Sequence, residues 1–223
     1  MVDWRDMDSS EPVDLASRRL DYDVGTLGID DMAEDPVDQW QAWFEAAVAH
    51  DVHEPNAMVV ATVDQRGWPH ARNVLVKGVD DRGFVFYTNY ESAKAGELES
   101  AAKASLLFSW LSMHRQVRIV GTVARVDEAE SDAYFAERPR GSQIGAWASP
   151  QSDLIAGPEV LEQAVADVTV RFEGDDVRRP SFWGGYRVTP VMFEFWQGRP
   201  SRLHDRLRYV WRNQAWSLER LAP

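Results

Sequence analysis

The sequence contains no cysteine among its 223 residues. Disulfides, thiolate metal sites and cysteine nucleophiles are therefore excluded. The chain also has no apolar run long enough to span a membrane, and its acidic first ten residues lack the apolar stretch of a signal peptide. We therefore expect a cytoplasmic protein without membrane contact, and the absence of cysteine is compatible with a reducing compartment.

Several common catalytic and nucleotide-binding motifs are missing as well. No Gly-x-Gly-x-x-Gly loop and no Walker loop occurs, so the usual dinucleotide and nucleoside triphosphate sites have no support. No serine-centred nucleophile elbow is present. His50 and His53 have a spacing that could bind a metal on a helix, but no third ligand accompanies them. We predict no metal site.

Positive charge is also scarce, because 24 Lys and Arg stand against 36 Asp and Glu, which gives a net charge of −12. A chain of this kind lacks the basic face that nucleic-acid binding requires. The charge is uneven, however: the first fifty residues are acidic, whereas arginines dominate between Arg178 and Arg220. These arginines form either a solvated, salt-bridged surface or a local anion site, since Arg binds phosphate in bidentate geometry. Composition leaves both interpretations open.

The length suits one domain with a substantial core. Residues 1–30 are polar and acidic with little periodicity, so we expect a flexible N-terminal arm, followed by a single domain over residues 31–223. Periodicity predicts helices over residues 36–50, 92–102, 127–137 and 159–172. It predicts strands over residues 57–63, 73–79, 84–88, 104–110, 116–126, 191–196, 207–211 and 215–218. This order favours a mainly β, α+β fold, an antiparallel barrel with peripheral helices, over a parallel sheet.

Polar residues gather at the ends of the predicted strands. The stretches are Arg72-Asn-Val-Leu-Val-Lys77, Phe86-Tyr-Thr-Asn89, Ser92-Ala-Lys-Ala95, Arg115-Gln-Val-Arg118, Arg138-Pro-Arg-Gly-Ser142 and the loop from Trp196 to Arg206. At Ser92 a helix N-terminus and Lys94 could together attract a phosphate. Each stretch alone is more often a surface strand end than a ligand site, but their density in one small domain indicates a functional site.

These stretches, at this spacing, resemble the pyridoxine/pyridoxamine 5′-phosphate oxidase family from about Arg19 to Pro223. Further matching segments are Gln143-Ile-Gly-Ala-Trp147, Gln151-Ser152, Ser181-Phe-Trp-Gly-Gly-Tyr186, Glu194-Phe-Trp-Gln-Gly198, Arg202-Leu-His-Asp-Arg206 and Glu219-Arg-Leu-Ala-Pro223. The resemblance implies an FMN-binding split β-barrel that forms a homodimer with FMN between the subunits. It implies an oxidoreductase, a pyridoxal 5′-phosphate synthase, in which FMN accepts a hydride from C4′ of pyridoxamine or pyridoxine 5′-phosphate. Dioxygen would reoxidise the flavin and give hydrogen peroxide, while the protein supplies orientation and charge.

The resemblance also assigns residues. FMN contacts fall on Arg72, Lys77, Tyr87, Thr88, Lys94, Gln116, Gln151, Ser152, Trp196 and Arg206. The substrate phosphate falls to Lys77, Tyr134, Arg138 and Ser142, and the ring and reacting carbon to the catalytic residues Arg202 and His204. Arg19 and Tyr22 match residues that fold over the bound substrate, which would make the arm a lid.

One position departs from the family pattern. The family often has a basic pair after the serine, whereas this chain has Ala93 before Lys94, so one expected cation on the FMN phosphate is missing. Two other functions remain open: another flavin or deazaflavin oxidoreductase on the same barrel, and a non-catalytic carrier of pyridoxal phosphate or FMN. The first would be expected to lack the substrate-phosphate residues, and the second would need neither His204 nor access for oxygen.

Overall fold

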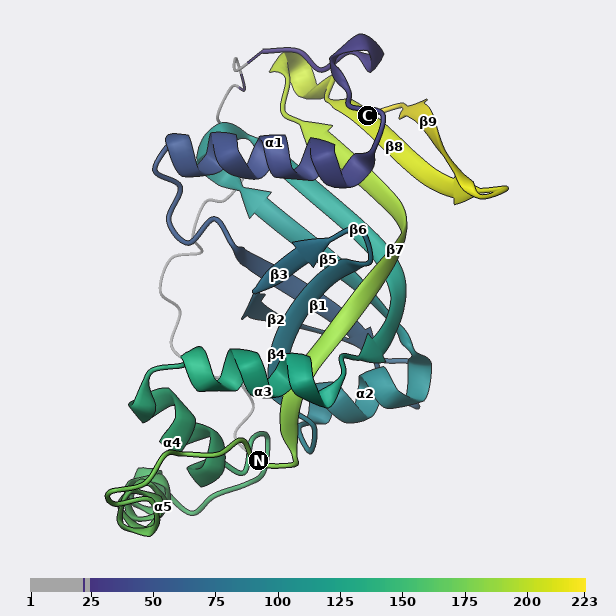
Figure 1. Ribbon diagram of the computed structural model, residues 1–223. Helices are drawn as coiled ribbons and strands as arrows, with labels where there is room; N and C mark the ends of the chain where they lie inside the picture. The colour runs from purple at the N-terminus through teal and green to yellow at the C-terminus, as the bar shows by residue number, and fades with distance from the viewer. Residues whose placement is uncertain (1–21, 23–24) are drawn as a thin grey trace, which may run out of the picture.

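A computed structural model describes residue 22 and residues 25–223 of the chain. Nine strands form one antiparallel sheet within this part of the chain. They are β1 (Ala57–Val63), β2 (Pro69–Leu75), β3 (Gly78–Asp80), β4 (Gly83–Asn89), β5 (Lys103–Trp110), β6 (Arg115–Arg125), β7 (Trp183–Gln197), β8 (Asp205–Arg212) and β9 (Ala215–Leu221). The strand order is β2-β1-β5-β6-β7-β4-β3, and the β8–β9 hairpin is added to β7. The sheet curls into a partial barrel (Figure 1), which confirms the predicted antiparallel architecture.

The long strand β7 holds the sheet together. Its first six residues pair with β4, its last six pair with β8, and β6 accompanies it from Tyr186 to Gln197. The pairing with β6 shifts register between Val120 and Gly121, opposite Pro190. A bulge suits a proline, which cannot donate to the ladder. A Cβ at Gly121 would clash with the carbonyl oxygen of Thr189, so glycine is required where the two strands approach most closely.

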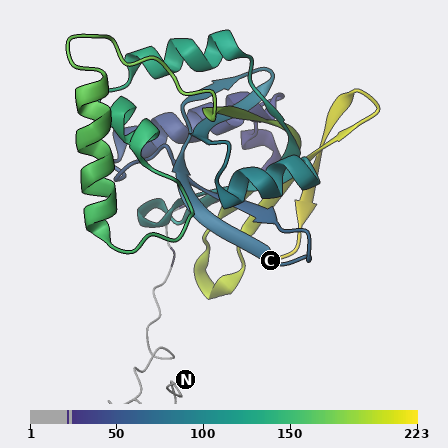
Figure 2. The same ribbon diagram turned by 90° about the horizontal axis from the view of Figure 1, so that it is seen from below.

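Five α-helices surround the described part of the sheet: α1 (Pro36–Ala49), α2 (Ala93–Ala101), α3 (Glu128–Glu137), α4 (Arg140–Ala148) and α5 (Pro158–Arg171). The side chain of Asp35 caps α1 by accepting from the backbone N–H of Val37, and Pro36 occupies the first turn. Helix α1 lies at the same end of the sheet as the β8–β9 hairpin, whereas α3, α4 and α5 lie at the other end (Figure 1). Seen from below, the hairpin projects away from α5 (Figure 2).

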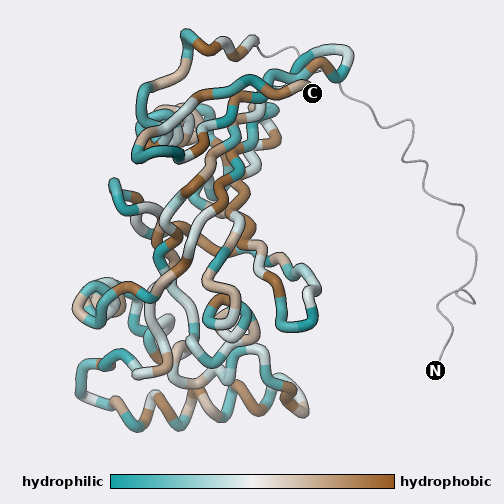
Figure 3. Tube along the Cα trace, turned by 90° about the vertical axis from the view of Figure 1, so that its right-hand side faces the viewer, coloured by the Kyte–Doolittle hydropathy of each residue, from teal (hydrophilic) through white to brown (hydrophobic). Residues whose placement is uncertain are grey.

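The core follows the sheet. Alternate residues of β1 point inward, and Trp40 and Trp43 of α1 cover that interior against Phe84, Phe108 and Phe195. Hydrophobic segments accordingly gather along the central strands in Figure 3. A second, smaller cluster of buried residues (Phe135, Ile144, Phe172, Val177 and Trp183) lies beneath α3, α4 and α5. No helix in the described part of the chain has both the length and the apolar composition needed to cross a bilayer.

Two expected strands differ from the observed elements, and one helix was not expected. The strand expected over residues 73–79 is two strands, β2 and β3, and the strand expected over 191–196 begins eight residues earlier, at Trp183. Helix α4 was not predicted. Residues 22 and 25–30 fall within the expected arm, and Leu27 is 6% exposed and packed in the core. The rest of the expected arm, including Arg19, lies outside the described residues.

Candidate functional site

One pocket of about 650 Å³ gathers most of the residues that the sequence assigned to phosphate binding. It lies where the end of β4 and the start of α2 face the α3–α4 corner. Eight predicted site residues line it: Lys77, Tyr87, Thr88, Lys94, Tyr134, Arg138, Ser142 and Gln151. Its volume falls in the range of roughly 300–1,000 Å³ that is usual for small-molecule sites.

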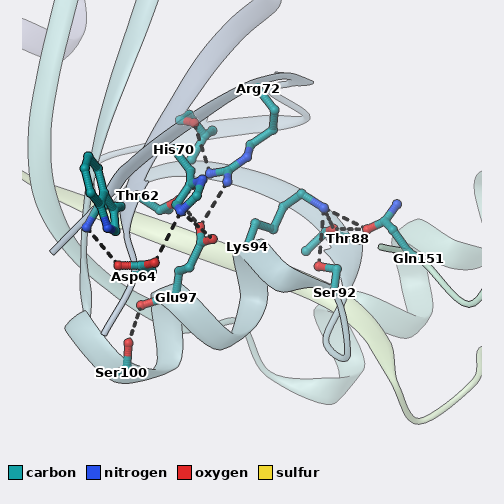
Figure 4. A network of polar contacts seen from close by, with 12 residues as sticks. Thr62, Asp64, His70, Arg72, Thr88, Ser92, Lys94, Glu97, Ser100 and Gln151 are labelled. Atoms are coloured by element: carbon teal, nitrogen blue, oxygen red, sulfur yellow. Dashed lines mark hydrogen bonds and ion pairs between the residues drawn. The ribbon is translucent and has the colours of Figure 1, made fainter. Parts of the chain in front are cut away.

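Lys94 supplies a half-buried ammonium group to this pocket (Figure 4). Its Nζ donates to Gln151 Oε1 at 2.8 Å, to Thr88 Oγ1 at 3.1 Å and to Ser92 Oγ at 3.3 Å, all neutral oxygens. No carboxylate within the described residues forms an ion pair with Lys94. Burial is the main reason why the pKa of Lys94 is lowered, and the nearby charge of Arg72 lowers it further. A buried cation without a counter-ion attracts an anion. Ser92 begins α2 as predicted, although its hydroxyl donates to the carbonyl oxygen of Asn89.

Arg138 supplies a further cation to the same pocket. Its guanidinium lies over the Trp183 ring at 4.4 Å, and its Nη1 is buried without a hydrogen-bond partner among the described residues. Tyr87 and Tyr134 stack on each other at 4.0 Å, and Tyr87 stacks on Trp183 at 5.5 Å. Burial raises the pKa of Tyr87 to about 12, so its hydroxyl stays protonated. An unpaired buried donor is costly, so Arg138 points to an anionic ligand.

Trp183 was not assigned a role from the sequence, although it lies within the matching segment from Ser181 to Tyr186. It lines the pocket and forms the flat wall on which Tyr87 and Arg138 stack. No cation predicted for the site is near Trp183 in the sequence, so its contact with Arg138 emerges only from the fold.

Arg72 of β2 does not line this pocket, although its charge acts on Lys94, and it is already paired. Its Nη2 donates to Glu97 Oε2 at 2.9 Å, and its Nη1 donates to the hydroxyl of Thr62. Glu97 was not predicted as a site residue, because the pairing joins a strand to a helix 25 residues further along the chain.

Ala93, the position of the missing cation, faces a different hollow. That hollow has a volume of about 340 Å³, and Asp64, Arg66 and Glu97 line it together with Ala93. The side chains of Ala93 and Lys94 therefore contribute to two separate depressions on either side of the start of α2.

A second group of predicted residues lies at the other end of β7. It consists of Tyr22, Gln116, Trp196, Arg202, His204 and Arg206. Trp196 is paired with Gln116 across the β6–β7 ladder and with Arg206 across the β7–β8 ladder. The His204 ring lies 4.6 Å from the Trp196 ring and 5.7 Å from that of Tyr22, and the Arg202 guanidinium is 5.6 Å from the Tyr22 ring. Tyr22, the described residue of the predicted lid, thus contacts both predicted catalytic residues, Arg202 and His204.

Hydrogen bonding fixes the protonation pattern of His204. The backbone N–H of Arg199 donates to Nδ1 at 3.0 Å, so Nδ1 is an acceptor and the neutral ring carries its proton on Nε2. Burial and the positive charge of Arg202 lower the pKa of His204, which favours the neutral form. Ser201 and Arg202 both adopt positive φ, at 57° and 64°. Left-handed conformations at consecutive non-glycine residues cost free energy and concentrate at functional sites.

Arg206 is held by Glu194, whose side chain is 7% exposed. Glu194 Oε1 accepts from Arg206 Nη2 at 2.7 Å, and its Oε2 accepts from Arg118 at 2.6 Å. Burial raises the pKa of this carboxyl, but the two arginines outweigh burial and lower it overall. Ser152, by contrast, is exposed with a φ of 81°, and it follows Gln151 in the chain without lining the first pocket itself.

The two groups are far apart within one chain. Trp183 lines the pocket and Trp196 belongs to the second group, thirteen positions further along β7. A strand rises roughly 3.3 Å per residue, so the separation along β7 is about 40 Å. One small ligand cannot contact both groups of the same chain.

Family comparisons cover nearly the whole chain. Residues 44–172 match the model described as pyridoxamine 5′-phosphate oxidase, and residues 183–223 match the pyridoxine 5′-phosphate oxidase C-terminal dimerisation region. The pyridoxine/pyridoxamine 5′-phosphate oxidase of Rubrobacter xylanophilus is 53% identical over 210 residues, which cover 94% of this chain and 97% of the relative. That of Synechocystis sp. is 49% identical over 211 residues, covering 95% and 99%.

Solved structures agree on the fold. PhzG from Burkholderia lata, in complex with tetrahydrophenazine-1-carboxylic acid, is 32% identical, with a TM-score of 0.84 over 90% of this chain and 99% of PhzG. A pyridoxamine 5′-phosphate oxidase-related, FMN-binding protein from Nostoc punctiforme is 18% identical, with a TM-score of 0.65 over 82% and 97% of the two chains. The second likeness shows the fold alone. Taken with the family models and the sequence identities, these matches show that the chain belongs to the pyridoxine/pyridoxamine 5′-phosphate oxidase family, a family of oxidoreductases.

Proposed function

We propose that this protein oxidises pyridoxamine 5′-phosphate and pyridoxine 5′-phosphate at C4′ to pyridoxal 5′-phosphate, with FMN as cofactor and dioxygen as electron acceptor, giving hydrogen peroxide. With the amine substrate, water hydrolyses the imine formed at C4′ and ammonia leaves. The names of the relatives support this reaction. The observation that carries it is the pocket lined by the cations Lys77, Lys94 and Arg138, of which Arg138 has a buried Nη1 without a hydrogen-bond partner among the described residues. Two phosphorylated ligands require several such cations.

The donor set fits FMN. Lys94, Arg72, Thr88 and Gln151 would hold its phosphate, since ammonium, guanidinium, hydroxyl and amide groups there all can donate to phosphate oxygens. FMN would supply the acceptor for the hydride that leaves C4′. Lys77, Tyr134, Arg138 and Ser142 would bind the substrate phosphate, with Arg138 braced against Trp183.

The separation along β7 supports a homodimer with sites between the subunits. Gln116, Trp196, Arg202, His204 and Arg206 lie about 40 Å along the strand from the pocket, at roughly 3.3 Å per residue. A two-fold axis can bring the pocket of one subunit against the second group of its partner. The match of residues 183–223 to a dimerisation region supports this arrangement.

Arg202 and His204 would act on the substrate ring from the partner subunit. Arg202 would lie over the ring and hold C4′ against the flavin, because orientation supplies much of the rate in such reactions. His204 would stay neutral and present its Nε2–H as a hydrogen-bond donor, since Nδ1 already accepts from the backbone of Arg199. Arg19 and Tyr22 would cover the substrate, and the contacts of Tyr22 with Arg202 and His204 support this role for the second of them.

The test is an aerobic assay of the FMN-loaded protein with pyridoxamine 5′-phosphate. We expect stoichiometric formation of pyridoxal 5′-phosphate and hydrogen peroxide. A flavin or deazaflavin reductase would give no peroxide, and a carrier would bind pyridoxal 5′-phosphate without turnover. Tetrahydrophenazine-1-carboxylic acid, the molecule in the PhzG complex, is the second substrate to assay because of the structural likeness. Faster turnover of that carboxylate, which has no phosphate for Arg138 and Lys77, would contradict the proposal.

A further inference from the structure

Within the described residues, Arg72 forms an ion pair with the carboxylate of Glu97, whereas Lys94, the other cation predicted at the FMN phosphate, has only neutral partners. The guanidinium, Thr62 and Glu97 form a closed set of hydrogen bonds (Figure 4): Arg72 donates to both partners, and the Thr62 hydroxyl donates to the same Glu97 oxygen that accepts from Arg72. The Glu97 side chain is only 10% exposed. Water therefore screens this pair less than it would screen a surface pair.

Lys94 and Glu97 lie on one helix with opposite roles. They are three positions apart on α2, so they are neighbours on its surface. Lys94 extends into the pocket toward Thr88 and Gln151, whereas Glu97 extends toward β2 and Arg72 (Figure 4). Arg72 lies close enough to Lys94 for its charge to lower the pKa of the ammonium group, so both cations face the same region.

A phosphate that binds between Lys94 and Arg72 meets two obstacles at Glu97. The carboxylate already uses the Nη2 donor of Arg72, and its negative charge repels a phosphate dianion nearby. The ring of His70 also lies near this carboxylate, with Nε2 3.9 Å from Glu97 Oε1 and 3.6 Å from Asp64 Oδ2. Any positive charge on His70 would therefore be shared between the carboxylates of Glu97 and Asp64.

We propose that Glu97 competes with the cofactor phosphate for Arg72, and thereby limits how strongly this protein prefers FMN over the unphosphorylated flavin, riboflavin. The inference rests on the proposed function, because it takes the Lys94–Arg72 region as the site of the FMN phosphate. It assigns to Glu97 a role in cofactor selectivity, opposite in sign to that of the cations around it.

The experiment measures the dissociation constants of the flavin-free protein for FMN and for riboflavin by quenching of flavin fluorescence. Glu97→Gln removes the charge while keeping the length and an oxygen that can accept from Thr62. We expect FMN to bind about tenfold more tightly, equivalent to about 1.4 kcal/mol, and riboflavin to bind as in the parent. Glu97→Ala, which removes the charge by truncation, should change the ratio of the two constants in the same direction.

Glu99→Gln is the matched control. Glu99 is on the same helix and also pairs with an arginine, Arg125, at 2.7 Å, and with the hydroxyl of Tyr186. It lines none of the hollows around Lys94, so both flavin affinities should stay at the parental values.

Two results would overturn the inference. Equal FMN affinity in the parent and in both Glu97 variants would mean that Glu97 does not compete with the phosphate for Arg72. Weaker FMN binding in folded Glu97→Gln would mean that the carboxylate positions Arg72 for the phosphate. A parent protein that binds neither flavin would instead contradict the proposed function, so the two failures are distinguishable.

Discussion

Hybrid dimers provide a direct test of a site shared between subunits. Arg138 lines the pocket at one end of β7, and Arg202 belongs to the group at the other end. Each variant alone, Arg138→Ala or Arg202→Ala, damages both sites of a homodimer. Loss of such a positioning contact costs about a hundredfold in rate.

A hybrid of the two variant chains separates the lesions. If each site takes Arg138 from one subunit and Arg202 from the other, one site of the hybrid is intact and the other carries both lesions. We therefore expect the hybrid to turn over at about half the wild-type rate per dimer, since one of two symmetric sites survives. This is roughly fifty times the rate of either parent variant, by the same hundredfold loss.

The assay uses co-expressed chains with two different affinity tags, purified in sequence so that only hybrids remain, and measures peroxide at saturating FMN and substrate. A hybrid of Arg138→Ala with Lys77→Ala is the matched control. Both residues line the same pocket, so each site retains one lesion and no activity returns. The reasoning would be refuted by an Arg138→Ala and Arg202→Ala hybrid that is no more active than its parents, because the site would then lie within one chain.

Three further outcomes are expected. Arg202→Ala and His204→Ala should both lower kcat/KM, by about a hundredfold for Arg202→Ala. Both variants should retain the flavin absorbance of the loaded protein, and loss of flavin from either would contradict this. The pKa of His204 lies below its ordinary value of 6.5, so the stability that the neutral ring contributes is present above pH 6.5 and is lost as the pH falls. The reason is that the unfolded chain takes up a proton at this histidine before the folded protein does. A midpoint at or above 6.5 in an NMR titration of the ring would contradict this. Ala93→Arg should tighten FMN binding by up to about tenfold. The gain should be smaller in a Glu97→Gln background, because an arginine at position 93 lies in the same hollow as Glu97 and would neutralise its charge. An equal gain in both backgrounds would mean that the new cation reaches the phosphate directly.

The elements that the sequence predicted well are those with a regular apolar pattern. The run Ala57-Met-Val-Val-Ala-Thr-Val63 matches β1 in both bounds, because alternate residues are buried. Strand β2 was misplaced because it ends the strand order of the sheet and has no fully buried residue, so no apolar alternation marks it. The start of β7 was missed because Gly184, Gly185 and Pro190 are typical of turns, yet here they allow close packing and a bulge.

The sequence identified the residue types of the site but not their arrangement. Lys94 and Arg138 were assigned to phosphates, and they do line one pocket. Their separation from His204, and the pairing of Arg72 with Glu97, depend on which strands and helices become neighbours. Side-chain pairs that join distant segments leave no local pattern, and they emerge only from the fold.

Strand β7 has one more consequence for a dimer of this kind. Trp183 at its beginning would belong to one site and Trp196 near its end to the other, so a single continuous strand would enter both. Hydrogen bonds to β4, β6 and β8 restrain it along its length. A shift of the strand upon ligand binding at one site would reach the second through the backbone itself. Cooperativity between the two sites would then require no separate relay, and the two binding events in such a dimer need not be independent.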